Sequence, residues 1–237
     1  MFDKLKIKTT YIITYLVLHL NLIAQDTLQP IKQLISSQNY STALEKINHF
    51  LSESPNNDSA LYLKCMVQIN LNQIKDASHT VNKLEKLNPN YYELYYLRGL
   101  ICSIKEKYAD AIFNFNKVVK ENSYHGKAWY NMALAKGLLE DYSNAIRDLN
   151  KCIFVSPKYA MAYYNRAYWH EKMENYDLAI TDYKKSIRLD HHFSESYVAL
   201  AYLYLKMGDS VNACETIHTA KSEGIESAND FMQIFCK

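Results

Sequence analysis

The segment AYYNRAYWHEKMENYDLAITDYKKSIRLD, at residues 162–190, contains the pattern from which the fold can be inferred. In its first half, Tyr163 stands one helical turn before the small Ala167. In its second half, Ala179 stands one turn before Tyr183. A large side chain beside a small one on the same helical face lets a neighbouring helix approach closely. A polar Glu-Asn-Tyr segment separates the two patterns, so the stretch predicts two amphipathic helices joined by a short turn.

Both patterns recur every 34 residues along the chain. The small residue of the second helix recurs as Ala43, Ala77, Ala111, Ala145, Ala179 and Ala213, followed one turn later by Ile47, Val81, Phe115, Leu149, Tyr183 and Ile217. The first helix repeats Leu61, Tyr95, Trp129, Tyr163 and Tyr197, followed one turn later by Cys65, Gly99, Ala133, Ala167 and Ala201. A fixed spacing between like residues indicates stacked structural units.

The period and the stretch quoted above resemble the tetratricopeptide repeat. This resemblance implies an all-α fold, a right-handed α-solenoid of antiparallel helix pairs over residues 25–237. About six units of 34 residues are expected, near residues 25–57, 58–91, 92–125, 126–159, 160–193 and 194–227. A capping helix is expected over residues 228–237, since the end of a solenoid needs a polar cover.

Residues 1–24 have the layout of a signal peptide. Lys4, Lys6 and Lys8 precede an apolar run over residues 11–24, which is too short to span a bilayer comfortably. We expect cleavage after Ala24, giving a periplasmic or secreted protein with no membrane span. Retention of this segment as an uncleaved anchor is the alternative.

The charge of the mature chain argues against nucleic acid as a partner. Removing residues 1–24 takes three lysines and one aspartate from the 27 basic and 25 acidic residues, which leaves no formal net charge. A neutral protein has no global field that attracts a phosphate backbone or an anionic membrane.

The sequence contains no motif that indicates catalysis. It has no glycine-rich phosphate loop, no nucleophile elbow, no His-Glu-x-x-His and no paired-cysteine zinc pattern. We therefore predict no catalytic residue, no metal site and no cofactor, and we interpret the adjacent His191 and His192 as part of a polar loop. Arg98 and Arg166 are candidates for anion binding, but the resemblance favours a structural role along the helix pair.

The five cysteines fall into two groups. Cys65, Cys102 and Cys152 occupy packing positions, where free thiols behave as small apolar residues. Cys214 and Cys236 flank Gly224 at similar distances, so an antiparallel hairpin turning at this glycine would bring them to the same level. Either a disulfide bond or two further free thiols fits this arrangement.

In proteins similar to this one, the first helix of each repeat lines a concave groove that holds the ligand. The candidate groove residues are Tyr62, Tyr96, Tyr130, Tyr164, Tyr168, Tyr202, Asn131 and Asn165, with Val198 in the tyrosine position of the last unit. Tyrosine offers a large contact area with a polar tip, which suits a binding surface, but the same rings could simply pack between helices. The two asparagines match one element of the family's clamp for chaperone tails. The leading lysine of that clamp is replaced by tyrosine, so chaperone tails are not expected.

These observations predict a binding protein and not an enzyme. The leading hypothesis is an exported scaffold or adaptor that holds a protein or peptide in its groove. The alternatives are a module that binds cell-wall glycan and an accessory subunit of an envelope enzyme complex. The identity of the partner and the oligomeric state are not predicted.

Overall fold

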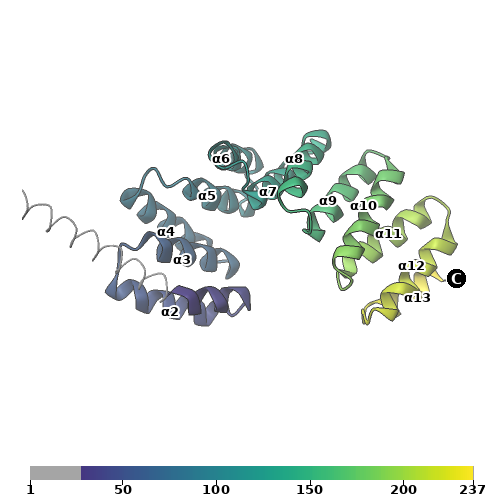
Figure 1. Ribbon diagram of the computed structural model, residues 1–237, viewed down its shortest axis with the longest axis horizontal. Coiled ribbons are helices and arrows are strands. Elements are labelled where there is room, and N and C mark those ends of the chain that lie inside the picture. Colours follow the sequence, from purple (N-terminus) through teal and green to yellow (C-terminus); the bar gives the residue numbers. More distant parts are fainter. Residues whose placement is uncertain (1–27, 237) are drawn as a thin grey trace, which may run out of the picture. The chain divides into compact units, whose positions relative to one another are not determined.

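The computed structural model describes residues 28–236, so the predicted signal peptide lies outside the described part of the chain. The chain divides between Leu97 and Arg98 into two compact units, each described by itself below. Every regular element between residues 28 and 236 is a helix, and successive helices form antiparallel pairs, which confirms the predicted fold class (Figure 1).

The first unit consists of consecutive helices that lie side by side. Residues 28–36 are helical and are followed by α2 (Tyr40–Glu53), α3 (Asp58–Asn70) and α4 (Ile74–Leu87), and the unit ends inside α5 (Glu93–Ile104). Its core joins the first three of these helices and contains Leu28, Ile31, Ala43, Ile47, Ala60 and Val67.

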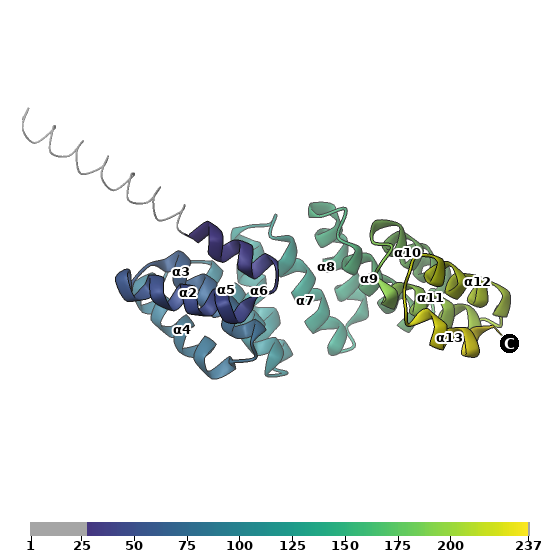
Figure 2. The same cartoon turned by 90° about the horizontal axis from the view of Figure 1, so that it is seen from below.

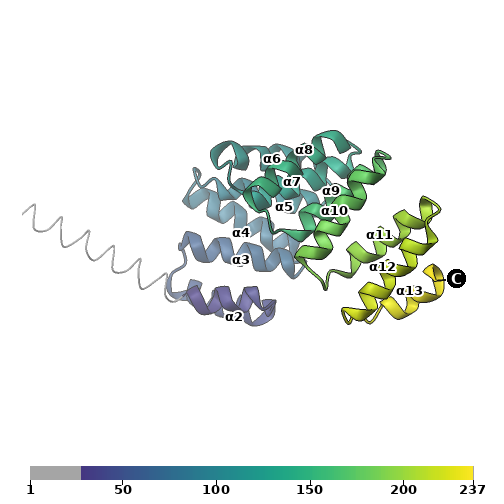
Figure 3. The same ribbon diagram turned by 45° about the vertical axis from the view of Figure 1, so that its right-hand side comes forward.

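The second unit continues the same alternation. After α5 come α6 (Tyr108–Glu121), α7 (Gly126–Leu138), α8 (Tyr142–Val155), α9 (Ala160–Lys172), α10 (Tyr176–Leu189), α11 (Ser194–Lys206), α12 (Ser210–Ser222) and α13 (Ala228–Phe235). Helices α7 to α12 pack in the pairs α7–α8, α9–α10 and α11–α12 (Figure 2). The short α13 packs on α12 and also touches α11 (Figure 3).

The small residues of the 34-residue pattern are the points of closest helix approach. All six alanines of the second-helix series are fully buried, and so are nearly all the large residues one turn after them. Gly99 of the first-helix series shows how tight the approach can be. A Cβ atom there would overlap the ring of Phe115 on α6, so only glycine fits without moving that ring.

The turn inside each helix pair depends on one residue in the left-handed backbone region. This residue also recurs every 34 positions, with φ between 57° and 82°, as Gln38, Asn72, Glu106, Glu140, Glu174 and Gly208. At the α7–α8 turn, the amide of Glu140 donates to the carbonyl of Gly137 and the amide of Asp141 donates to that of Lys136, both at 3.0 Å. These bonds satisfy carbonyls at the end of the first helix, which would otherwise lack partners.

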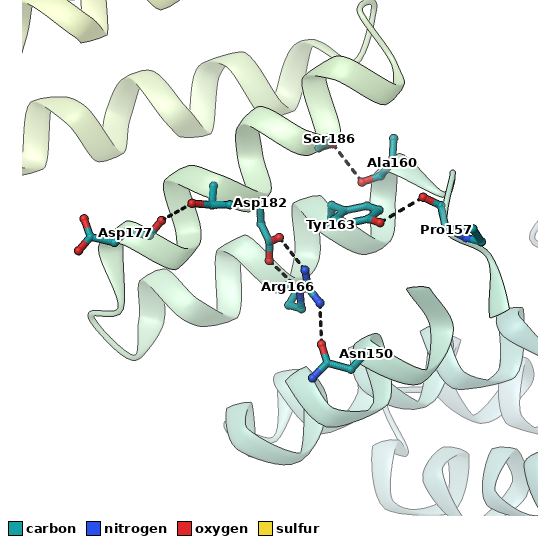
Figure 4. Close-up of polar contacts among 9 residues, drawn as sticks. Asn150, Pro157, Ala160, Tyr163, Arg166, Asp177, Asp182 and Ser186 are labelled. Atoms are coloured by element: carbon teal, nitrogen blue, oxygen red, sulfur yellow. Dashed lines mark hydrogen bonds and ion pairs between the residues drawn. The ribbon is translucent and has the colours of Figure 1, made fainter. Parts of the chain in front are cut away.

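The large residue that opens the first helix is anchored to the loop before it. Trp129 Nε1 donates to the carbonyl of Ser123 at 2.8 Å. The Tyr163 hydroxyl donates to the carbonyl of Pro157 at 3.1 Å, as Figure 4 shows. Each bond links the first helix to the loop that precedes it.

Candidate functional site

The predicted tyrosine stripe does not form one continuous surface. Tyr96 and Tyr130 are buried, with only 4% and 7% of their surface exposed. Tyr62, Tyr164 and Tyr168 are half-buried, whereas Tyr202 on α11 is 49% exposed. Of these tyrosines, Tyr202 in the last repeat is therefore the most accessible to a ligand.

Three of the less exposed tyrosines pack against an aromatic ring near the start of the next first helix. The ring pairs and their centroid distances are Tyr62–Tyr91 at 6.3 Å, Tyr130–Tyr159 at 5.0 Å and Tyr164–Phe193 at 5.2 Å. Each pair is edge-to-face, an arrangement that aromatic quadrupoles favour. These contacts join each first helix to the loop that leads into the next repeat, so the packing role considered for the stripe is present at these positions.

The two candidate asparagines behave differently. Asn165 Nδ2 donates to the Tyr130 hydroxyl at 3.0 Å and to the carbonyl of Met161 at 2.9 Å. Asn131 Nδ2 donates to the carbonyl of Lys127 on its own helix at 2.8 Å. Asn165 thus links two repeats, and its amide stabilises a hydroxyl whose pKa is raised by burial.

The second unit contains a cleft of about 490 Å³ built from three helices, α9, α11 and α13. The residues lining it are Tyr164, Ser194, Glu195, Val198, Ala199, Tyr202, Ser227 and Phe231. Two of the predicted groove tyrosines and the Val198 of the stripe therefore meet in one cavity. Glu195 and Phe231 were not predicted, and Phe231 enters the cleft only because α13 folds back on the last repeat.

The cleft combines aromatic walls with one carboxylate. Of the described residues that line it, Glu195 alone carries a charge. The pKa of the Tyr164 hydroxyl is raised, first by burial and then by the negative charge of Glu195. Ser194 Oγ donates to Glu195 Oε2 at 3.0 Å. An exposed carboxylate beside the faces of aromatic rings attracts a cationic group.

Arg166 is held by side chains of its own unit. Its Nε and Nη2 donate to the two carboxylate oxygens of Asp182 at 2.6 and 2.7 Å, and its Nη1 donates to Asn150 Oδ1 at 2.6 Å (Figure 4). This fork binds α9 to α10 and to α8, which agrees with a structural role. His191 and His192 are both exposed in the loop before α11.

A second cleft, of about 380 Å³, lies in the first unit and has a basic lining. Lys64, His79 and Lys83 contribute to it, and Thr80 beside them donates to Gln68 Oε1 at 2.7 Å. None of these residues was singled out from the sequence. No predicted groove residue lines this cleft.

The cysteines are arranged as one bonded pair and three free thiols. Sγ of Cys214 and Sγ of Cys236 are 2.07 Å apart and form a disulfide bond between α12 and the end of α13. Cys65 and Cys152 are free and buried, and burial raises the pKa values of their thiols to about 12 and about 11. Cys102 is also free but only half-buried.

Comparison with known sequences identifies repeat families along most of the described chain. Three family models described as tetratricopeptide repeat match residues 126–159, 160–193 and 182–215. A model described as the TT21 fifth ARM repeats domain matches residues 33–136. No curated protein sequence matches the chain. Across residues 28–236, no helix has the length and apolar character needed to cross a bilayer.

Several solved structures have a similar fold at low sequence identity. TTC0263, a thermophilic TPR protein of Thermus thermophilus, is 19% identical with a TM-score of 0.67, and the match covers 76% of this chain and 98% of that one. YrrB, described as a TPR protein with an unusual peptide-binding site, is 16% identical with a TM-score of 0.58, covering 75% and 91%. A chain of the APC/C hetero-tetramer Cut9-Hcn1 is 14% identical with a TM-score of 0.77, covering 89% and 42%.

Proposed function

Because the chain belongs to the tetratricopeptide-repeat family, we propose that it is an exported scaffold that binds a segment of another protein. The binding site in this proposal is the cleft between α9, α11 and α13. The observation that carries it is the meeting of Tyr164, Tyr202 and Phe231 around one open cavity. Aromatic side chains in a pocket supply much of the binding energy at protein interfaces.

The negative charge of Glu195 in the cleft favours one kind of peptide segment as the ligand. A lysine or arginine side chain can lie against the aromatic walls while its charge approaches the Glu195 carboxylate. A cation over an aromatic face contributes about 0.5–2 kcal/mol, depending on how far it is removed from water. The proposed ligand is therefore an extended peptide with a basic side chain flanked by apolar residues.

The description of YrrB supports a peptide as the class of ligand, since that protein with a similar fold has a peptide-binding site. A cell-wall glycan would use the same exposed tyrosine by stacking a sugar ring on it. A glycan has no cationic group to match Glu195 unless it carries free amines, so the carboxylate favours the peptide.

A peptide array and a glycan array, both incubated with the purified protein, test this proposal. We expect enrichment of peptides that contain lysine or arginine. Both Tyr202→Ala and Glu195→Gln should weaken binding to the best peptide by roughly 5- to 30-fold, which corresponds to about 1–2 kcal/mol.

The matched control is Tyr124→Ala, because Tyr124 is 73% exposed and lies outside the cleft. This variant should bind like the wild type. Binding to glycans alone, or peptide binding that is unchanged in both cleft variants, would refute the proposed site.

The export part of the proposal rests on the charged and apolar layout of residues 1–24. N-terminal sequencing of the protein isolated from the envelope fraction of its native cells tests it. We expect the sequence to begin at Gln25. A chain that begins at Met1 in the membrane fraction would support the uncleaved anchor instead.

A further inference from the structure

Three side chains with metal-ligand atoms meet where α13 is fastened to α12. They are Cys214 and His218 on α12 and Cys236 directly after α13, and their ligand atoms lie within 4.8 Å of one another. His218 follows Cys214 by one helical turn, so both side chains project from the same face of α12. Met232 adds a thioether, whose Sδ is 3.9 Å from Cys236 Sγ.

We propose that reduction of the Cys214–Cys236 bond converts this cluster into a binding site for a thiophilic d¹⁰ cation, Zn²⁺ or Cu⁺. Two thiolates and one imidazole are ligands of this class, and a sulfur-rich site discriminates against Mg²⁺ and Ca²⁺, which prefer oxygen. Since His218 is exposed, a water molecule or another ligand can reach the fourth coordination position.

The geometry requires only small movements. Zinc bonds of about 2.3 Å to sulfur and about 2.0 Å to nitrogen place tetrahedral ligand atoms roughly 3.5–3.8 Å apart. The three ligand atoms already lie within 4.8 Å, and the two cysteine Cα atoms are 4.8 Å apart. Rotation of the cysteine side chains can separate the two sulfur atoms, and the backbones of α12 and α13 can stay in place.

The chemistry balances with a dithiol as reductant. The dithiol supplies two electrons and two protons, the Sγ–Sγ bond breaks, and the dithiol becomes a disulfide. Cys214 and Cys236 are then thiols, and each releases its proton when the cation binds its sulfur. The cation replaces the covalent link, so α13 stays attached to α12 in both the oxidised and the reduced states.

The experiment uses the purified protein, reduced with a phosphine and freed of the reductant under argon. Co²⁺ is the spectroscopic probe for the Zn²⁺ arm, because thiolate ligands give it intense near-ultraviolet charge-transfer bands, and a competition assay with a chromophoric chelator serves the Cu⁺ arm. We expect the reduced protein to bind one equivalent of metal in the Co²⁺ titration, in the Cu⁺ competition assay, or in both. The oxidised protein should show no such band.

Three variants distinguish a specific metal site from nonspecific binding of metal by cysteine thiols. His218→Ala keeps both cysteines and should weaken binding at least about 10- to 100-fold, which is the cost of losing even an outer-shell partner. The double variant C214S/C236S should abolish the signal, whereas Cys102→Ser should bind like the wild type. Circular dichroism of each variant checks that the helices remain formed.

Equal metal binding by reduced wild type and His218→Ala would overturn the proposal, and so would a signal that survives in C214S/C236S. Because His218→Ala can still form the disulfide, its oxidised form should melt like the oxidised wild type. A loss of metal binding in this variant therefore reports on the ligand and not on folding.

Discussion

The amide of Asn165 donates a hydrogen bond to the hydroxyl of Tyr130, 3.0 Å away on the preceding first helix. Tyr130 is buried against Tyr159, and the bond is partly shielded from solvent. Asn165→Ala should lower the free energy of unfolding by about 1 kcal/mol, the usual net contribution of such a bond. Urea denaturation followed by circular dichroism measures this difference.

A double-mutant cycle with Tyr130→Phe identifies the bond as the cause. The two substitutions together should cost clearly less than the sum of their separate effects, because both remove the same contact. Asn116→Ala on the exposed surface of α6 is the control and should change stability by no more than about 0.5 kcal/mol. Fully additive effects would mean that this hydrogen bond does not stabilise the stack.

Arg166 stabilises three helices, and its removal should be more costly. Arg166→Ala leaves the buried Asp182 carboxylate without the guanidinium group that binds both of its oxygens. We expect the free energy of unfolding to fall by about 3 kcal/mol. Arg166→Lys keeps the charge but not the fork, so it should lose a smaller part of this. The control is Arg188→Ala, an exposed residue of α10, and a loss at Arg166 no larger than at this position would contradict the expected role.

Asp148 makes stability depend on pH in a direction that is unusual for a carboxylate. Burial raises the pKa of its carboxyl above the ordinary value of 3.8, and the hydrogen bond and charge of Lys136 offset this only in part. The folded protein therefore binds the proton more tightly than the unfolded chain does. This contribution to the free energy of unfolding must fall as the pH rises from the ordinary pKa to the raised one, and must be constant above it.

Asp148→Asn removes the titrating group and provides the comparison. The free energy of unfolding of the wild type minus that of the variant should decrease across this acidic window and then level off. Urea denaturation at a series of pH values measures it. A difference that increases with pH would show that the attraction of Lys136 outweighs burial.

Two substitutions at left-handed turn residues should have opposite effects on stability. One of them removes a glycine and the other introduces one. Gly208 has φ of +82° and a Cβ atom there would touch nothing, so Gly208→Ala should cost roughly 1–2 kcal/mol through the backbone alone. Glu140 has φ of +61°, and Glu140→Gly should therefore stabilise the protein by up to about 1 kcal/mol. Thermal melting of each variant and of the wild type measures these differences in stability.

The control for the second substitution is Glu121→Gly in the last turn of α6. Glycine inside a helix is unfavourable by about 1 kcal/mol relative to alanine, so this change should destabilise. Destabilisation by Glu140→Gly to the same extent would show that φ does not decide the effect.

The disulfide bond should fasten the end of the second unit. It joins residues 22 positions apart, and a loop of that size corresponds to about 3 kcal/mol in the chain-entropy account. In metal-free buffer, C214S/C236S should therefore increase hydrogen exchange in α12 and α13, with little change in α7 and α8. Cys102→Ser is the control, and increased exchange spread evenly over the unit would contradict a local role.

Thiol counting checks the same bond directly. The unfolded protein should have three alkylatable cysteines without reductant and five after reduction, as measured by mass spectrometry. Five alkylated cysteines without reductant would show that the bond is absent.

The core could be predicted from the sequence because it depends on contacts that repeat. Each alanine of the second-helix series, from Ala43 to Ala213, lies at a point where helices meet, and each is fully buried. Such a position tolerates only small residues in every unit, so the period records it directly. The helix pairs and the all-α class follow from this pattern.

The 34-residue period did not predict which tyrosines of the stripe are buried and which are exposed. Whether Tyr130 or Tyr202 faces solvent depends on whether an aromatic ring of the following loop packs against it. It also depends on the angle between successive repeats. A signal was present in the loops, since Tyr91, Tyr159 and Phe193 also share the 34-residue phase. The last repeat is followed by α13 instead of another repeat, and this difference leaves Tyr202 exposed beside Phe231.

Helix α13 takes the place on α12 that a following first helix takes on α8 and on α10. The two helices share one hydrophobic core, in which Ala220 of α12 and Ala228 of α13 are both buried. Detachment of α13 would therefore expose apolar surface of α12 to solvent, and an exposed apolar surface promotes association with other chains.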